Sequence, residues 1–81
     1  MDVHEIKADN VLDARGLTCP MPLLKTKKTL KDMKSGQILE ILGTDPGSKN
    51  DIPEFGSKAG NQFLGMTDDQ AGFTRYFIKK G

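Results

Sequence analysis

The segment over residues 37–42 constrains the fold more than any other part of the chain. Its residues, Gln-Ile-Leu-Glu-Ile-Leu, are apolar on nearly both faces of an extended chain, which is typical of a central strand with a neighbour on each side. Because 81 residues can enclose only one core, this strand is expected at the centre of that core. We therefore predict a single domain over residues 1–81, in which residues 1–8 form a mobile tail.

The first half of the chain predicts a strand followed by a helix. Residues 10–14 are expected to form a short strand, and the Arg-Gly-Leu-Thr sequence that follows is expected to form a turn. Residues 19–22, Cys-Pro-Met-Pro, then open a helix that runs to about residue 34, where a Ser-Gly pair ends it.

The second half of the chain predicts a second helix. Residues 43–50 form a loop that contains an Asp-Pro-Gly turn. Asp51 is expected to cap the helix, with Pro53 in its first turn and Glu54 completing a capping box. Gly60 is expected to end it.

The last twenty residues predict a hairpin, which completes the fold. Residues 61–67 and 72–79 both alternate between apolar and polar side chains, as half-buried strands do. The resulting order β-α-β-α-β-β predicts an α+β fold, a two-layer α/β sandwich in which a four-stranded mixed sheet carries both helices on one face. The other sheet face has no covering layer and is a natural partner surface.

This topology also predicts where the chemistry lies. If the first two strands are parallel, their carboxyl ends share one edge of the sheet, and both helices begin at that edge. We therefore expect Cys19, Asp45 and Asp51 to be near neighbours, although they are far apart in the sequence.

A single cysteine and a single histidine narrow the possible chemistry. Cys19 alone excludes an internal disulfide framework and a cysteine-rich zinc site, and His4 alone excludes a multi-histidine metal site. The sequence has neither a phosphate-binding loop nor a Ser-His-Asp grouping. We predict no cofactor and no metal, and any chemistry has to pass through Cys19.

Charge and hydropathy narrow the partners and the compartment. A net charge of +1 excludes a strongly basic nucleic-acid module, so no stable nucleic-acid binding is expected. No apolar run is long enough for a transmembrane helix, and the N-terminal residues do not resemble a signal peptide. We expect a cytoplasmic protein that does not bind membranes and is a monomer able to enter transient complexes.

The Cys-Pro-x-Pro sequence is the candidate functional motif. A helix optimised only for its own start favours Ser, Asp or Asn as cap, whereas here Cys19 is expected to take that position. The partial positive charge and free N–H groups of the helix N-terminus would favour the thiolate. Arg15 would add a cation, and a nearby Asp45 or Asp51 would oppose it. The residues expected to support Cys19 are Arg15, Gly16, Pro20, Met21, Pro22, Asp45 and Asp51.

A thiolate in this position suits a sulfur carrier. It could take up a sulfane sulfur as a persulfide and pass it to an acceptor thiolate. With no second cysteine in the chain, delivery has to be to another molecule, so this is a relay carrier rather than a self-sufficient enzyme. The alternative is that Cys19 is a small apolar core residue.

The first predicted helix carries a series of lysines. Lys25, Lys28 and Lys31 turn outward, which would suit docking to an acidic partner. The alternative is an ordinary solvated helix face.

Two stretches resemble a known family. Residues 12–22, Leu-Asp-Ala-Arg-Gly-Leu-Thr-Cys-Pro-Met-Pro, resemble the signature of the TusA/SirA-like sulfur-carrier family. Further residues resemble the second stretch typical of that family and its last strand, so that the match covers roughly residues 9–80: Asp45, Pro46, Asp51, Ile52, Pro53, Phe55, Gly60, Phe77, Ile78 and Lys79.

The resemblance implies the same β-α-β-α-β-β fold and a persulfide on Cys19. It implies a cysteine desulfurase or a rhodanese-like protein as sulfur donor, and a DsrE-like protein or another sulfurtransferase as acceptor. The outlets known in the family include tRNA thiolation, molybdenum cofactor work and dissimilatory sulfur oxidation. Some members carry a second cysteine in the second helix, where this chain has Gly56, so an intramolecular redox variant is excluded.

Two other functions remain open from the residues alone. In the first, the chain is a non-catalytic interaction or regulatory module, whose working surfaces are the open sheet face and the lysine helix, and Cys19 is incidental. In the second, it binds RNA, an analogy of fold that the near-neutral charge and the two arginines do not favour.

Overall fold

The computed structural model describes residues 7–18, 20–57 and 60–81. In chain order its elements are β1 (Asn10–Ala14), α1 (Met21–Asp32), β2 (Ile38–Gly43), α2 (Ser48–Gly56), β3 (Gln62–Asp68) and β4 (Thr74–Lys79). The predicted order β-α-β-α-β-β is confirmed. Most of the predicted tail lies outside the described residues, and the single domain over residues 1–81 stays a prediction.

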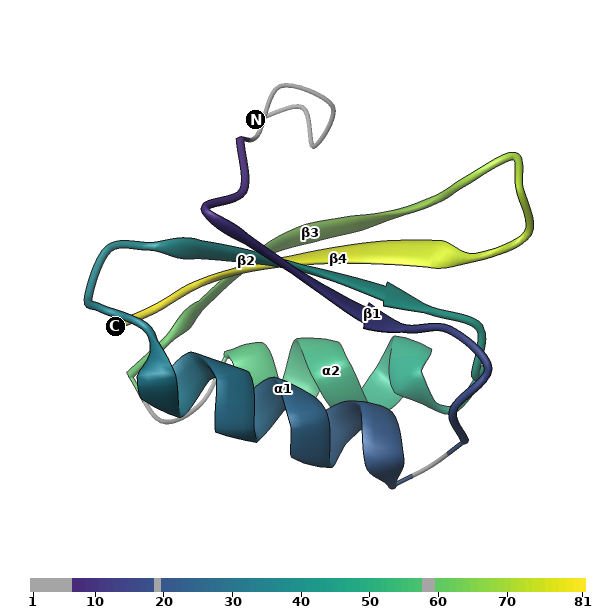
Figure 1. The fold of residues 1–81 in the computed structure, drawn as a ribbon, viewed down its shortest axis with the longest axis horizontal. Helices are drawn as coiled ribbons and strands as arrows, with labels where there is room; N and C mark the ends of the chain where they lie inside the picture. The colour runs from purple at the N-terminus through teal and green to yellow at the C-terminus, as the bar shows by residue number, and fades with distance from the viewer. Residues whose placement is uncertain (1–6, 19, 58–59) are drawn as a thin grey trace.

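The four strands form one sheet in the order β1-β2-β4-β3. β1 pairs with β2 in parallel, and β4 pairs with both β2 and β3 in antiparallel fashion. Both helices lie against the same face of this sheet, as Figure 1 shows. The predicted two-layer α+β fold with a mixed sheet is therefore confirmed, and β2 is an interior strand as its apolar sequence indicated.

The core lies between the sheet and the two helices. Leu39 and Ile41 of β2 are fully buried there, and Tyr76 and Ile78 of β4 pack with them. Because successive side chains of a strand point to opposite faces, Phe77 points to the other side of the sheet. It is only 1% exposed although no helix covers that face in Figure 1, so neighbouring side chains cover it.

The first helix starts later than predicted. Pro20, not Cys19, is the N-cap of α1, and its carbonyl accepts the first helical bond, from the Leu24 N–H, at 3.0 Å. The prediction that a cysteine caps this helix is therefore wrong. Cys19 itself lies outside the described residues.

The second helix starts earlier than predicted, and Asp51 is not its cap. The N-cap is Gly47, the last residue of the Asp-Pro-Gly turn, because this turn leads directly into the helix. The Asp45 carbonyl accepts the Ser48 N–H at 3.2 Å, and the Asp45 carboxylate accepts the Ser48 hydroxyl at 3.3 Å. Asp51 is consequently an acidic residue of the first turn, and Pro53 lies inside the helix.

Candidate functional site

The candidate site is built on the turn of residues 15–18, which joins β1 to the residues before α1. The Leu17 N–H donates to the Ala14 carbonyl at 3.2 Å and closes the turn. Gly16 has a φ of 83°, a left-handed conformation that other residues adopt only at a cost. Its N–H donates to the Thr44 hydroxyl at 2.9 Å, so the turn is joined to the carboxyl end of β2 as well as to β1.

The start of α1 offers fewer free N–H groups than an ordinary helix. A helix has four N-terminal N–H groups without an internal partner, but here two of the four positions are Pro20 and Pro22, which have none. The Met21 N–H already donates to the Thr18 carbonyl at 2.9 Å. The first turn of α1 therefore has fewer N–H groups able to bind an anion than a helix start without prolines.

Pro22 is also part of the packing. It is fully buried, and its carbonyl accepts a hydrogen bond from the buried Thr26 hydroxyl at 2.8 Å. Met21, by contrast, is 42% exposed. In the first turn of α1, Pro22 thus packs into the core, whereas Met21 is exposed and accessible to a partner.

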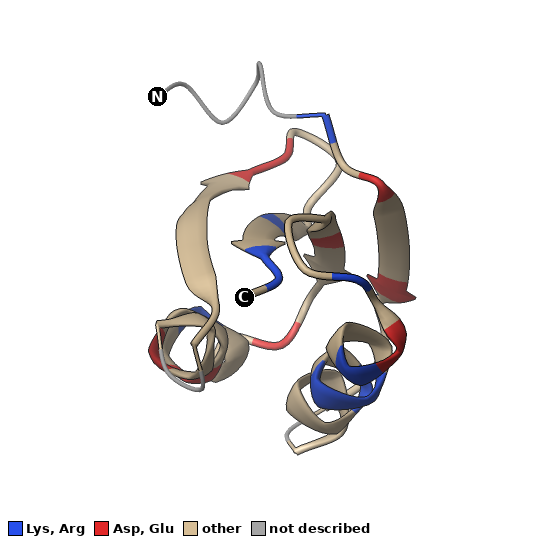
Figure 2. Cartoon of the chain, turned by 90° about the vertical axis from the view of Figure 1, so that its left-hand side faces the viewer, with Lys and Arg blue, Asp and Glu red and all other residues tan. Residues whose placement is uncertain are grey.

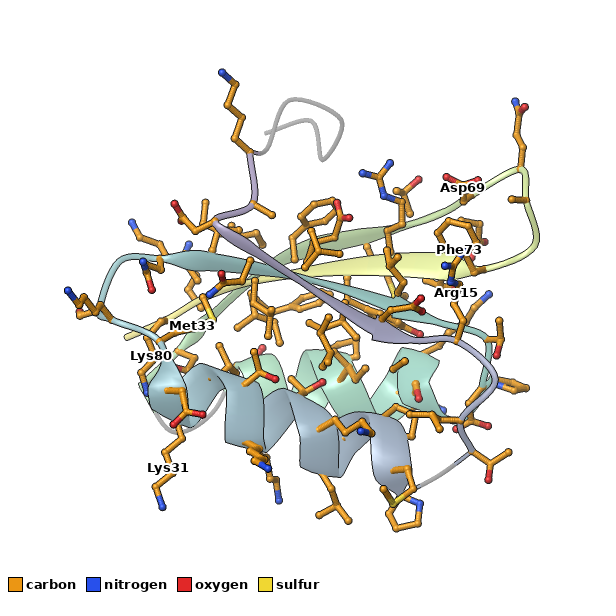
Figure 3. All side chains as sticks on the ribbon, in the orientation of Figure 1. Arg15, Lys31, Met33, Asp69, Phe73 and Lys80 are labelled. Atoms are coloured by element: carbon orange, nitrogen blue, oxygen red, sulfur yellow. The ribbon has the colours of Figure 1, made fainter. Side chains whose placement is uncertain are left out.

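Arg15 is held by two contacts on the sheet side of the turn. Its guanidinium donates two hydrogen bonds to the Asp13 carboxylate, at 2.9 and 2.8 Å. It also lies over the Phe73 ring, 5.1 Å from the ring centre, and Figure 3 shows Arg15, Phe73 and Asp69 gathered at one corner of the molecule. The Arg15 contacts lower the pKa of Asp13 to about 2. Asp13 in turn raises the pKa of Arg15.

The carboxylates of Asp45, in the loop after β2, and of Asp51, in α2, line different hollows. Asp45 lies in a hollow of about 320 Å³ beside Thr44, Lys49, Asp68 and Phe73. Asp51 lies in one of about 270 Å³ between the helices, beside Leu23, Lys27, Glu54 and Phe55. The structure thus gives the predicted neighbours separate surroundings, and only Asp45 shares its hollow with residues that contact the 15–18 turn.

The predicted docking lysines are exposed on α1. Lys25 and Lys28 flank a hollow of about 330 Å³ between α1 and β1, and Lys31 points away from the sheet (Figure 3). Figure 2 shows the basic residues of α1 gathered along one helix, whereas acidic residues occupy the strand ends and the other helix. The helix therefore offers a basic surface, and its role stays a prediction.

Sequence reasoning did not assign a role to three residues of this site. Asp13 lies within the recognised motif, two residues before Arg15, and that spacing was the available signal. Thr44 and Phe73 contact the turn only through the fold. Neither has a local sequence pattern that indicates this contact.

The described part of the chain shows neither a metal-binding cluster nor a membrane-spanning helix. Residues 7–18, 20–57 and 60–81 contain no group of three or more His, Cys, Asp or Glu side chains able to hold a metal ion. None of the helices formed by these residues has the length and hydropathy that crossing a bilayer requires.

The fold and the site define a class of small α+β proteins in which one cysteine lies just before the first helix, beside a proline pair. A family model described as sulfurtransferase TusA matches residues 10–80. The chain belongs to this TusA family, as the motif residues indicated.

Named relatives show the same likeness. YrkF of Bacillus subtilis is 47% identical over 76 residues, covering 94% of this chain but 40% of that protein. YrkI of the same organism is 45% identical over 76 residues, covering 94% of this chain and 100% of that protein. The sulfur carrier protein TusA of Allochromatium vinosum is 44% identical over 72 residues, covering 89% of this chain and 93% of that protein.

A solved structure shares the fold. The SirA-like protein of Desulfitobacterium hafniense matches with a TM-score of 0.79 and covers 89% of this chain and 97% of the other. At 23% identity, this likeness supports the fold alone.

Proposed function

We propose that the chain is a cytoplasmic sulfur carrier that holds sulfane sulfur as a persulfide on Cys19. The observation that carries the proposal is the position of the one cysteine: it follows a turn held by both β1 and β2 and precedes the proline-rich start of α1. Membership of the TusA family and the relative named as a sulfur carrier support the same role.

The transfer consists of two displacements at sulfur. In loading, the Cys19 thiolate attacks the outer sulfur of a donor persulfide, the donor S–S bond breaks, and the donor leaves as a thiolate. In delivery, an acceptor thiolate attacks the outer sulfur of the Cys19 persulfide, and Cys19 leaves as a thiolate. Each step moves one sulfur atom without net oxidation. The chain has no second cysteine to form an internal disulfide, so the sulfur passes to another molecule.

The chain contributes geometry and a local field rather than a complete catalytic apparatus. Pro20 and Pro22 restrict the backbone after Cys19. The N-terminal end of α1 follows Cys19 directly, and the helix dipole at this end favours a thiolate or persulfide anion. A stabilised thiolate is also a better leaving group in delivery. Specificity and most of the rate acceleration then come from the partners, so the chain is a relay rather than a self-sufficient enzyme.

The proposal extends to partner classes. The donor is a cysteine desulfurase or a rhodanese, and the acceptor is a DsrE-like protein or another sulfurtransferase. The sulfur serves tRNA thiolation, cofactor synthesis or sulfur metabolism. The exposed face with Lys25, Lys28 and Lys31 would bind acidic partner surfaces. A carrier that meets two partners in turn is best served by a monomer and transient interfaces.

The test is the intact mass of the protein after incubation with a cysteine desulfurase and cysteine, or with a rhodanese and thiosulfate. We expect a gain of one sulfur atom that a reductant removes, and no gain in Cys19→Ser with the fold unchanged by circular dichroism. Loading of Cys19→Ser, or failure of the wild type with both donors, would contradict the proposal.

A second candidate is a non-catalytic interaction module. The observation in its favour is the open sheet face, which carries no helix in Figure 1 and on which Val11 is 60% exposed. This function predicts that Cys19→Ala leaves partner binding and cellular function unchanged. The mass experiment and this substitution together separate the two functions.

A further inference from the structure

We propose that Phe73, in the loop between β3 and β4, is a positioning residue for the Cys19 thiol and acts through Arg15. The inference rests on the proposed sulfur-carrier function. It assigns a role to a loop that belongs neither to the Cys-Pro-x-Pro motif nor to the helix that follows it.

Arg15 contacts residues of two different segments, Asp13 and Phe73. Arg15 opens the turn that leads to Cys19, and its guanidinium contacts both the Asp13 carboxylate and the face of the Phe73 ring. The carboxylate fixes two N–H groups of the guanidinium in one plane, and the aromatic face holds that plane from the side. Asp13 also accepts the Arg15 backbone N–H at 3.1 Å, so the same carboxylate fixes both ends of this residue.

Phe73 lies in a loop that is closed by its own hydrogen bonds. The Asp69 N–H donates to the Phe73 carbonyl at 2.7 Å, and the Gly72 N–H donates to the Asp69 carbonyl at 3.1 Å. The Asp69 carboxylate accepts the Ala71 N–H at 2.9 Å. The aromatic ring is therefore presented by a closed hairpin loop, which is a firm support for the Arg15 side chain.

The turn of residues 15–18 gains from the contact of Phe73 with Arg15. Gly16 holds a left-handed conformation, and its one described tertiary hydrogen bond is the 2.9 Å bond to the Thr44 hydroxyl. A glycine in a loop has large conformational freedom to lose. Asp13 and Phe73 hold Arg15, and Thr44 holds the N–H of Gly16. Together with the bond from the Leu17 N–H to the Ala14 carbonyl, these contacts limit that freedom, and thereby limit the directions in which the chain can present Cys19.

The experiment compares Phe73→Ala and Phe73→Tyr with Arg75→Gln. Tyrosine keeps the aromatic face under Arg15. Arg75 provides a matched control, because it also pairs with a carboxylate (Glu40, 2.7 Å) and lies over a phenylalanine (Phe77, 5.7 Å) without contacting the turn through any described bond. Arg15→Lys, which keeps the charge but loses the planar fork, is a second variant in case Phe73→Ala does not fold.

Two measurements are made on each variant. The first is hydrogen exchange at the Gly16 amide by NMR, which needs no sulfur donor. The second is the rate of sulfur loading against donor concentration, followed by mass. We expect Phe73→Ala and Arg15→Lys to raise Gly16 exchange and lower the maximal loading rate, each about two- to five-fold, which is the effect of losing one cation–π contact. The half-saturating donor concentration should stay unchanged, and Phe73→Tyr and Arg75→Gln should behave as the wild type.

These outcomes distinguish a failure of the inference about Phe73 from a failure of the sulfur-carrier function on which it rests. Unchanged Gly16 exchange in Phe73→Ala would overturn the inference, and so would raised exchange with an unchanged loading rate. An equal loss in Arg75→Gln would also overturn it, because the effect would then follow general stability. If no donor loads the wild type, the sulfur-carrier function fails, and Gly16 exchange alone still decides whether Phe73 holds the turn.

Discussion

The two arginines of this chain take part in the same arrangement in two different places. Arg15 pairs with Asp13 and lies over Phe73, and Arg75 pairs with Glu40 and lies over Phe77. The first arrangement stands at the end of β1, with side chains 46% and 54% exposed for Arg15 and Asp13. The second crosses the middle of the sheet, where Arg75 and Glu40 are 34% and 12% exposed.

The two groups have the same chemistry and differ in burial, so burial distinguishes their roles. In the interior of the sheet, Arg75 and Glu40 cover Phe77, which is 1% exposed, and so take the place of a missing second layer. At the end of β1, Arg15 and Asp13 are about half exposed, and Arg15 is the first residue of the turn that leads to Cys19. The first arrangement should serve stability, and the second should serve the position of the turn.

The largest expected effect tests the buried side of this comparison. Phe77→Ala should lower the free energy of unfolding by about 3–5 kcal/mol, because a fully buried aromatic side chain is lost and a cavity remains. Phe73→Ala should cost far less, because Phe73 is half-buried. Chemical denaturation of both variants measures the difference. Equal losses would show that the two phenylalanines play the same structural role.

A smaller effect is expected at the Glu40–Arg75 pair. Glu40→Gln should lower the free energy of unfolding by about 1 kcal/mol, because the Arg75 charge remains over a largely water-excluded surface without its partner. Asp13→Asn should shift the denaturation midpoint less, since the charges of Asp13 and of its partner Arg15 are both open to water. The matched pair of denaturation curves is the measurement, and a larger shift for Asp13→Asn would reverse the comparison.

The smallest effect is a dependence on pH at the exposed pair. The pKa of Asp13 is about 2 in the folded chain against an ordinary 3.8, so the unfolded chain binds more protons between these values. The contribution of the pair is therefore present above pH 4 and is lost as the pH falls toward 2. The stability difference between wild type and Asp13→Asn should shrink over this range, and added salt should reduce it at pH 7. A difference that does not change between pH 4 and pH 2 would contradict the assigned pair.

Much of the fold could be predicted from local patterns. The apolar segment around Leu39 and Ile41 indicated an interior strand, and alternation after residue 60 indicated the hairpin. The helix starts were less predictable, because an Asp followed three residues later by a Glu resembles a capping box wherever it occurs. At Asp51 this pattern begins within the first turn of a helix that starts at the Asp-Pro-Gly turn.

The candidate site, too, could be predicted only in part. The motif residues around Cys19 could be recognised from the sequence, and with them the family. The sequence indicated that Arg15 adds a cation near Cys19, but it did not indicate that Arg15 pairs with Asp13, although the two are close in the chain. The sequence indicated that Asp45 and Asp51 are neighbours, and this stays a prediction. The structure adds that the two residues line separate hollows.

The order of the elements, the single thiol and the proline-rich segment beside it could be read from local patterns, since alternation, turn chemistry and motif spacing act within a few residues. The contacts of the turn before Cys19 with Thr44, from the end of β2, and with Phe73, from the β3–β4 loop, depend on the fold. A hydrogen bond or a ring contact between distant segments requires a particular sheet order and register, which no local pattern encodes.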